Sequence, residues 1–489
     1  MWGIEQKKFA IYIVYQKKCV SLHARKRAGN EINNSKSIKN LNGVANWNTS
    51  NVTSLKGTFL NCSQLTELDL SGWNTTKVTD YSNIIAGCPA SIYYGDFWTI
   101  EKDNRFVYKK PQPILASQYT WFAPADTTIT RASITQIEVL DSYTPTGNEN
   151  HSWDASATKT ESVMCYVIGT RLIIAGKDNK ILANKDSSFL FSVKSDMNDY
   201  FSNVTEIKGL QNLNTSNVTI LRGAFAYCGA LTVIEDLGTW DTSKVTNLNG
   251  AFAKCLSIEY IEGLENWVTD NVTTMVSIFS GNSYVGDMKI KSLDNITNWN
   301  TSKVENMSGM FYGCAQLTEL DLSKWDVSKV WAFDHTFCDC FNLKTLKISN
   351  WNVSFCGDFD AMFNDCYSLE VLDLSEWDTS GARNMGQMFE GCSSLKKIIG
   401  IENFNTSKVD NRRMINPYTK EDERLTADFQ EMFQGCSSLE ELDLSSFDTK
   451  LACDFRKMFN QCSKLKTIYV SELWSIESTV NESGENMFN

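Results

Sequence analysis

The feature that most constrains the fold is a repeat of 26 residues in the second half of the chain. A tryptophan and a cysteine each recur at this interval: Trp299, Trp325, Trp351 and Trp377, and Cys314, Cys340, Cys366 and Cys392. A fixed period of this size is typical of stacked supersecondary units, each of which contacts only its neighbours. We therefore expect a solenoid and not one globular core.

Each unit combines two apolar patterns. Leu320 and Leu322 alternate with polar residues, which predicts a short strand with one buried face. The pair Ser302 and Glu305 matches a capping box, so a helix is expected to begin near Lys303. Its apolar face is predicted by spacings of three and four residues among Val304, Met307, Met310, Phe311 and Cys314. The predicted fold class is an α/β repeat solenoid, leucine-rich-repeat-like, with one short strand and one short helix per turn.

The unit has the motif W-[ND]-[TV]-S-x-V-x-x-M-x-x-M-F-x-x-C-x-x-L-x-x-L-D-L-S. It resembles the BspA-like leucine-rich repeats of bacterial and protist surface proteins, which are related to the repeats of mycoplasma lipoproteins. The resemblance covers residues 41–88 and 201–489. It implies surface exposure and adhesion to host or bacterial ligands, whereas the spacing alone predicts only the solenoid.

The chain divides into four predicted segments. Residues 1–40 form a basic N-terminal segment, for which we favour a strand over a signal peptide. Residues 41–88 are a two-turn repeat fragment, and residues 201–489 are a solenoid of about ten turns. Residues 89–200 lack the repeat and form a β-rich inserted or capping module, in which Gly169 and the following threonine suit a hairpin turn.

The interval between Phe404 and Phe447 is longer than one unit. The excess lies at residues 411–425, which are polar and contain Pro417. We expect a loop that projects from one edge of the solenoid, and insertions of this kind often serve binding.

Fifteen cysteines occur, and ten of them occupy one repeat position. We interpret the ten as small buried apolar residues, because a regular ladder would seldom offer disulfide geometry to every pair. The cysteine pattern does not indicate whether the chain is in an oxidising or a reducing compartment. The ten are Cys62, Cys88, Cys228, Cys255, Cys314, Cys340, Cys366, Cys392, Cys436 and Cys462.

No pattern of catalytic residues is present. The three histidines, His23, His151 and His335, are far apart in the sequence. The chain has no nucleotide-binding glycine loop, no H-E-x-x-H, no G-x-S-x-G and no cysteine pairs at zinc spacing. We therefore predict no enzyme activity, no catalytic residue, no metal and no cofactor.

The candidate ligand-binding residues occupy the strand position between the two inward apolar residues. This position should face outward, and in five of eight turns it holds a carboxylate, with Lys347 and Ile399 among the others. The functional hypothesis is a carboxylate stripe that binds a basic partner, a glycan or a divalent cation. The alternative is a solvated face that only preserves solubility. The candidates are Glu235, Glu262, Asp321, Asp373, Asp443 and Tyr469.

The sequence is compatible with two functions. The first is a surface-exposed, non-catalytic recognition or adhesion protein, extracellular or on the cell surface, that binds a protein or glycan ligand. The second is a structural or receptor-binding subunit of a larger extracellular assembly such as a phage tail or capsid appendage, located in the virion. The net charge of −12 makes nucleic acid an improbable partner. No segment is long and apolar enough to predict a membrane span.

Overall fold

The computed structural model describes most of the chain between residues 52 and 488. The gaps are residues 66, 71–72, 74–78, 81, 88–90, 94–97, 101–105, 109–112, 118–119, 160, 178–179, 193–198, 282–286, 411–413, 420–421, 424–427 and 477–486. The predicted basic segment at residues 1–40 lies outside the described residues. The chain forms two compact units, Met1–Pro113 with Thr158–Ser162, and Ile114–Ala157 with Val163–Asn489.

The first unit contains a short piece of the repeat. Strand β1 (Glu67–Asp69) pairs in parallel with β2 (Ser91–Tyr93), and β3 (Trp98–Ile100) pairs antiparallel with β4 (Phe106–Tyr108). The backbone N–H of Phe59 donates to a carbonyl 25 residues further on, at Ile84. Phe59 is fully buried.

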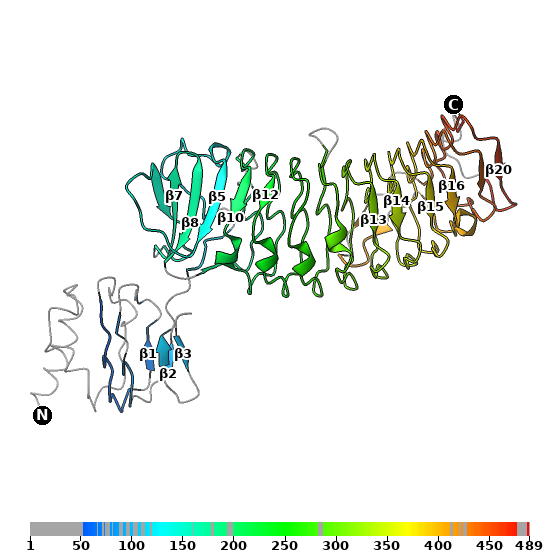
Figure 1. The fold of residues 1–489 in the computed structure, drawn as a ribbon. Helices are drawn as coiled ribbons and strands as arrows, with labels where there is room; N and C mark the ends of the chain where they lie inside the picture. The colour runs from blue at the N-terminus through cyan, green and yellow to red at the C-terminus, as the bar shows by residue number, and fades with distance from the viewer. Residues whose placement is uncertain are drawn as a thin grey trace, which may run out of the picture. The chain divides into compact units, whose positions relative to one another are not determined.

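The second unit begins with a six-stranded sheet in the order β12-β10-β5-β8-β7-β6 (Figure 1). Its strands are β5 (Gln136–Leu140), β6 (His151–Asp154), β7 (Val163–Ile168), β8 (Arg171–Gly176), β10 (Glu206–Lys208) and β12 (Val233–Ile234). Strands β7 and β8 form the hairpin expected at Gly169, which has a left-handed φ of 61°. β5 pairs in parallel with both β8 and β10. The first strands of the array therefore extend the sheet of the β-rich module.

Further pairs of parallel strands lie along the array (Figure 1). The pairs are β9 (Ile181–Leu182) with β11 (Leu213–Asn214), β13 (Glu319–Asp321) with β14 (Thr345–Lys347), β15 (Val371–Asp373) with β16 (Lys397–Ile399), and β19 (Glu441–Asp443) with β20 (Thr467–Tyr469). Short 3-10 helices occupy Arg131–Ser133, Leu210–Asn212, Leu237–Thr239, Leu264–Asn266, Asp294–Ile296 and Ile401–Asn403.

The prediction of one short helix per turn is wrong for the described coils. The residues expected to form it make consecutive tight turns, with the Met310 N–H donating to the Met307 carbonyl and the Cys314 N–H to the Phe311 carbonyl. The alternate N–H groups donate to the next coil, as from Phe311 to the carbonyl of Thr336 at 2.9 Å. This segment is therefore hydrogen-bonded between coils, as the strands are.

Left-handed residues make these turns possible. Gly309 has a φ of 58° and Gly313 a φ of 71°, and the equivalent residues of the next coil, His335 and Asp339, have φ values of 54° and 59°. Side chains other than glycine rarely adopt this conformation. The hydrogen bonds between coils offset its cost. The parallel bridges of this ladder begin at Asp186, ahead of the predicted start of the solenoid.

Aromatic rings stack along the core from coil to coil. The ring centroids of Phe311 and Phe337 are 5.4 Å apart, and those of Phe337 and Phe363 are 5.7 Å apart. A second stack includes Trp351 and Trp377, whose planes differ by 4°. Each of these tryptophans donates its indole N–H to a backbone carbonyl of the preceding coil. Burial of Trp351 and Trp377 is thus accompanied by hydrogen bonding of their polar edge, whereas the buried indole N–H groups of Trp240 and Trp267 have no such partner within the described residues.

The repeat cysteines are buried thiols, as predicted. Those from Cys228 to Cys436 are buried and form no disulfide, and Cys462 is half-buried. Each thiol from Cys228 to Cys462 also donates to a phenylalanine carbonyl of the preceding coil. Cys88 lies outside the described residues. A small side chain with a weak donor therefore suits this position.

The W-N-T-S motif holds one coil to the next. The Thr301 hydroxyl is buried and donates to the carbonyl of Asp326 in the following coil at 2.9 Å. The Ser302 N–H donates to Oδ1 of Asn300, which closes a local turn. The expected capping box at Ser302 is absent, since Val304 continues with another turn, donating to the carbonyl of Thr301.

Candidate functional site

The predicted stripe lies on the strand surface of the array. Asp321, Asp373 and Asp443 are the last residues of β13, β15 and β19, and Tyr469 is the last residue of β20. Their side chains are exposed or half-exposed. Apolar neighbours on either side, such as Leu320 and Leu322, are buried. The outward orientation of these positions follows from this alternation.

The carboxylates do not adjoin one another in the six array strands β13–β16, β19 and β20. Asp321 is opposite Lys347, Asp373 is opposite Ile399, and Asp443 is opposite Tyr469 in the parallel register. Acidic and non-acidic residues alternate from coil to coil. Successive carboxylates in these six strands are therefore about 10 Å apart, twice the strand spacing.

Each of these aspartates also has a local structural role. Oδ1 accepts the backbone N–H two residues on, as from Ser323 to Asp321 at 3.1 Å and from Ser375 to Asp373 at 3.0 Å. The Lys347 ammonium, 2.8 Å from Oδ2, and Ser323 together lower the pKa of Asp321 to about 2. The D-x-S sequence is thus a turn motif at the end of the strand.

The two glutamates lie in earlier coils. Glu235 follows β12, and its carboxylate is 3.5 Å from the ammonium of Lys208, which also pairs with Glu206 at 2.7 Å. Glu262 occupies the equivalent place in the next coil and is exposed. The structure therefore places all six predicted residues on one surface, but it does not gather them into one cluster.

A second column of alternating charge lies beside the stripe. Lys396 pairs with Glu370 at 2.6 Å, and Lys466 pairs with Glu440 at 3.0 Å, each across neighbouring coils. These lysines lower the pKa of the glutamates that they contact. The sequence analysis missed this column, although the residue after each inward leucine alternates in sign from Lys344 to Lys466.

Apolar side chains are exposed on the same surface. Val371 is 50% exposed and Tyr469 is 51% exposed, and both belong to strands of the array. Tyr260 and Val233 are exposed at the position equivalent to Val371 in earlier coils. The strand surface therefore presents carboxylates, ammonium groups and apolar side chains in alternation.

The turn segments carry a polar network that the sequence analysis did not predict. Glu390 accepts hydrogen bonds from the amides of Gln387, Gln434 and Asn364, at 2.7, 2.6 and 2.8 Å. Burial raises the pKa of Glu390, and the charge of Glu431 adds to this. These residues join three successive coils, so the network is structural.

An acidic group surrounds His335 in the neighbouring coils. Nδ1 of His335 is 3.6 Å from the carboxylate of Asp334, and this contact raises the pKa of the imidazole. Burial raises the pKa of Asp360 to about 6 and that of Asp358 above its usual range. Within the described residues, no group of histidine, cysteine or carboxylate side chains has the arrangement of a metal site.

The inserted segment folds back onto the array at its described residues. β17 (Met414–Ile415) pairs antiparallel with β18 (Asp422–Glu423). The Tyr418 hydroxyl donates to the carbonyl of Lys329 at 2.6 Å, and its ring meets the ring of Phe355 edge-on. Residues 411–413, 420–421 and 424–427 lie outside the described part, so the prediction of a projecting loop is tested only at its tip. There the segment contacts two earlier coils.

Comparison with known proteins identifies the repeat. A family model described as "Mycoplasma protein of unknown function, DUF285" matches residues 30–103, 195–292, 282–400, 318–427 and 370–489. These matches cover well over half of the chain. The chain belongs to the DUF285 family. The predicted relationship to BspA-like and mycoplasma-type repeats is thereby confirmed.

Solved structures similar to this DUF285 chain include leucine-rich repeat proteins. One from Bacteroides ovatus is 16% identical, with 59% of this chain and 82% of that chain covered and a TM-score of 0.22. One from Eubacterium ventriosum is 15% identical, with 68% and 95% covered and a TM-score of 0.27. A leucine-rich cell surface protein from Faecalibacterium prausnitzii is 12% identical, with 80% and 98% covered and a TM-score of 0.22.

No curated protein matches the DUF285 chain. Among its described residues, no helix has the length and apolarity needed to cross a membrane.

Proposed function

We propose that this DUF285 chain is a non-catalytic recognition protein that acts outside the cell or on its surface. Its strand surface would bind a protein or glycan ligand. The observation that supports this most is the alternation of charged and apolar side chains on a backbone fixed by hydrogen bonds between coils. A rigid surface loses little conformational entropy on binding.

The chemistry of this surface favours a protein ligand with basic groups. Oδ1 of Asp373 accepts a backbone N–H, and the residue is exposed. Val371 and Tyr469 offer apolar area close to the carboxylates. Tyrosine is enriched at protein interfaces because it combines a large apolar ring with a polar hydroxyl.

The β-rich module is proposed to cap the N-terminal end of the array. Its strand β5 supplies a parallel partner for β10, and β8 then covers the other edge of β5. The core of the first coils would otherwise be exposed, and solenoids need such protection at their ends. This proposal places the cap in the part of residues 89–200 that belongs to the second unit, from Ile114 onwards, and keeps residues 201–489 as the binding solenoid.

The test is a binding screen of the full chain against glycans, matrix proteins and bacterial cells. It uses a triple variant, Asp321→Asn, Asp373→Asn and Asp443→Asn, which keeps the local acceptor of each turn. The matched control is Asp326→Asn, Asp378→Asn and Asp448→Asn, which removes the same charge from the turn after the aromatic residue. Other coils carry Asn at that control position, for example Asn352.

Loss of binding in the first variant alone would support the strand surface as the site. Equal loss in both variants would indicate a general charge effect and would contradict the proposal. Absence of any binding, together with assembly of the chain into particles, would favour the structural subunit of an extracellular assembly.

A further inference from the structure

A pair of stacked aromatic rings lies at the surface of the array, beside the cysteine column. Phe341 and Tyr367 each follow a column cysteine and belong to neighbouring coils. Their ring centroids are 5.0 Å apart and their planes differ by 8°. Tyr367 is 42% exposed, although it stacks on Phe341. One face of the Tyr367 ring is therefore covered by Phe341, and the opposite face is directed toward the following coil.

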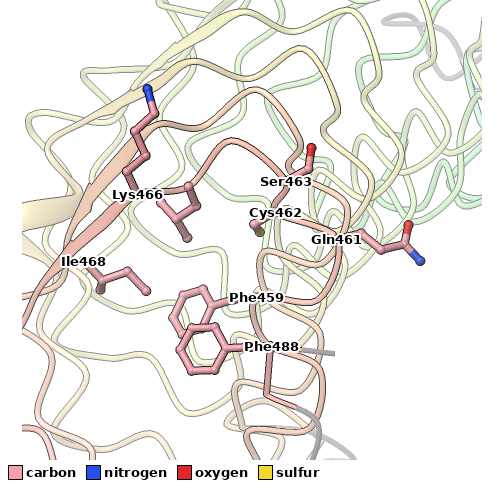
Figure 2. A pocket seen from close by; sticks show the side chains of 8 residues that line it. Phe459, Gln461, Cys462, Ser463, Lys466, Ile468 and Phe488 are labelled. Carbon is pink, nitrogen blue, oxygen red and sulfur yellow. The ribbon is translucent and has the colours of Figure 1, made fainter.

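The following coils place only small side chains beside this second face of Tyr367. The Ser394 N–H donates to the Tyr367 carbonyl at 3.2 Å, which makes Ser393 the neighbour of Tyr367 in the next coil. Ser437 and Ser463 hold the equivalent place in the two coils after that, and Ser463 is labelled in Figure 2. Two coils span about 10 Å at the strand spacing, which leaves room for a flat group against the ring.

A carboxylate borders the same face of the ring. Asp365 has a left-handed φ of 57°, and a Cβ added at Gly391 in the next coil would overlap its Oδ1. The carboxylate therefore leans over the following coil, the direction in which the free face of Tyr367 points. Burial and the charge of Asp365 raise the pKa of Tyr367 to about 12, and a hydrogen bond between the two side chains adds to this.

Negative charge around the ring is not balanced. Asp339 and Glu390 lie in the coils on either side of Asp365. The charge of Asp365 adds to the raised pKa of Glu390, whose main cause is burial. Within the described residues, neither Asp365 nor Glu390 is in an ion pair. A cation at the free face of Tyr367 would therefore be attracted by the carboxylates and by the negative face of the ring.

The coils that form this surface are described without a break. Residues 287–410 and 428–476 contain no gap. At its described tip, the inserted segment contacts Lys329 and Phe355, which precede the turn segments of their coils. Tyr367 follows the turn segment of its coil. The described tip is therefore at the other end of the turns from Tyr367.

We propose that Tyr367 and Asp365 bind an arginine side chain of a partner protein. The planar guanidinium would stack on the free face of the ring, within about 6 Å of its centroid, and its N–H groups would donate to the carboxylate. A lysine ammonium has no flat face with which to stack while it pairs. From the proposed function this takes only that the partner is a protein with basic groups, because Tyr367 lies outside the strands.

The test uses the full chain with N-acetyl-arginine-N-methylamide as the probe, followed by saturation-transfer difference NMR. A titration at millimolar concentrations should saturate. Tyr367→Ala removes the ring, and Asp365→Asn removes the charge while asparagine still tolerates a left-handed φ. Each is expected to raise the Kd about three- to fivefold, the effect of one exposed cation–π contact or ion pair. Tyr367→Phe keeps the ring face and should leave the Kd within about twofold of the parent.

Asp378→Asn is the matched control, because it removes an exposed aspartate charge from the next coil and should leave the Kd unchanged. Thermal melts establish that the variants fold. Absence of saturable binding would overturn the proposal, as would equal loss in Asp378→Asn and Asp365→Asn, or equal affinity for the lysine analogue of the probe. Loss only in the triple variant Asp321→Asn, Asp373→Asn and Asp443→Asn would place the guanidinium on the strand surface. That result would overturn this proposal and leave the proposed function standing.

Discussion

The thiol of Cys366 donates to the backbone carbonyl of Phe337 in the preceding coil, with 3.2 Å between sulfur and oxygen. Burial raises the pKa of this thiol well above its ordinary value, and neighbouring cysteines in the same column add to the shift. The thiolate, which is the reactive form, is therefore suppressed in the folded protein.

This predicts slow alkylation of the cysteine column. At pH 8, iodoacetamide should modify Cys366 at least about tenfold more slowly than the half-exposed Cys453, because it is both inaccessible and protonated. Peptide mass spectrometry over a time course gives the two rates. In 6 M guanidinium the difference should vanish, whereas equal rates in the folded protein would contradict the buried position.

Truncation of a repeat tryptophan should be costly. Trp325→Ala removes a 4% exposed side chain that packs on Phe311 and donates to the carbonyl of Ile296. We expect a loss of ~3–5 kcal/mol in the free energy of unfolding, measured by urea titration. The exposed Asp373→Asn, which keeps its local acceptor, should change it by less than about 0.5 kcal/mol. The reverse ranking would contradict the assignment of inward and outward faces.

Asp360 should make the array less stable as pH rises. Its pKa is about 6 in the folded protein because of burial, against 3.8 for the free side chain. The folded state therefore binds a proton more tightly between about pH 4 and pH 6, and ionisation above this window weakens the fold. Asp360→Asn should gain about 1–2 kcal/mol over the parent at pH 7.5 and none at pH 4, in urea titrations.

The control for this pH effect is a carboxylate whose pKa is shifted in the opposite direction. Hydrogen bonds from Ser445 lower the pKa of Asp443, so its charged form supports the folded state above its usual pKa. Asp443→Asn should therefore lose stability relative to the parent at pH 7.5 and not at low pH. The same sign for both variants would show that the pH dependence has another source.

The contact of the inserted segment with the array should limit local opening of that segment. Tyr418→Phe removes the hydroxyl that donates to the carbonyl of Lys329 and keeps the ring against Phe355. One such bond contributes about 0.5–1.5 kcal/mol, so amide hydrogen exchange at Asn416, Tyr418 and Thr419 should accelerate about 2- to 10-fold. Tyr469→Phe, on the exposed strand surface, should leave these rates unchanged.

The sequence predicted the elements that repeat within one unit. The spacing of Leu320 and Leu322 correctly placed a strand, and the recurrence of Trp351 and Cys366 correctly placed buried columns. These are properties of side-chain burial, which an apolar period records directly.

The helix prediction failed because a helix and a chain of tight turns can share the same apolar spacing. Met307, Met310 and Phe311 lie inward in a chain of tight turns as they would in a helix. The deciding feature is the left-handed φ at Gly309 and His335. A histidine in the sequence does not indicate a left-handed φ. The hydrogen bonds that favour this conformation are made with the next coil. A window of one unit therefore could not distinguish the two.

For the candidate residues, the outward orientation could be predicted, but their neighbours could not. Outward positions such as Asp373 could be read from the strand period. The partner of each residue across coils could not, because it depends on the register between coils, which sets Lys396 against Glu370.

The turn segments and strands both direct their backbone hydrogen bonds to the next coil, as from Phe311 to Thr336 and from Leu322 to Lys347. A pulling force along the stacking direction would act on all of these bonds of one coil at once. The coils should therefore separate one at a time, starting at an end. Each unit of 26 residues would then release about 85 Å of extended chain. Such an array would lengthen stepwise under load, and the coils still stacked would keep their surface intact.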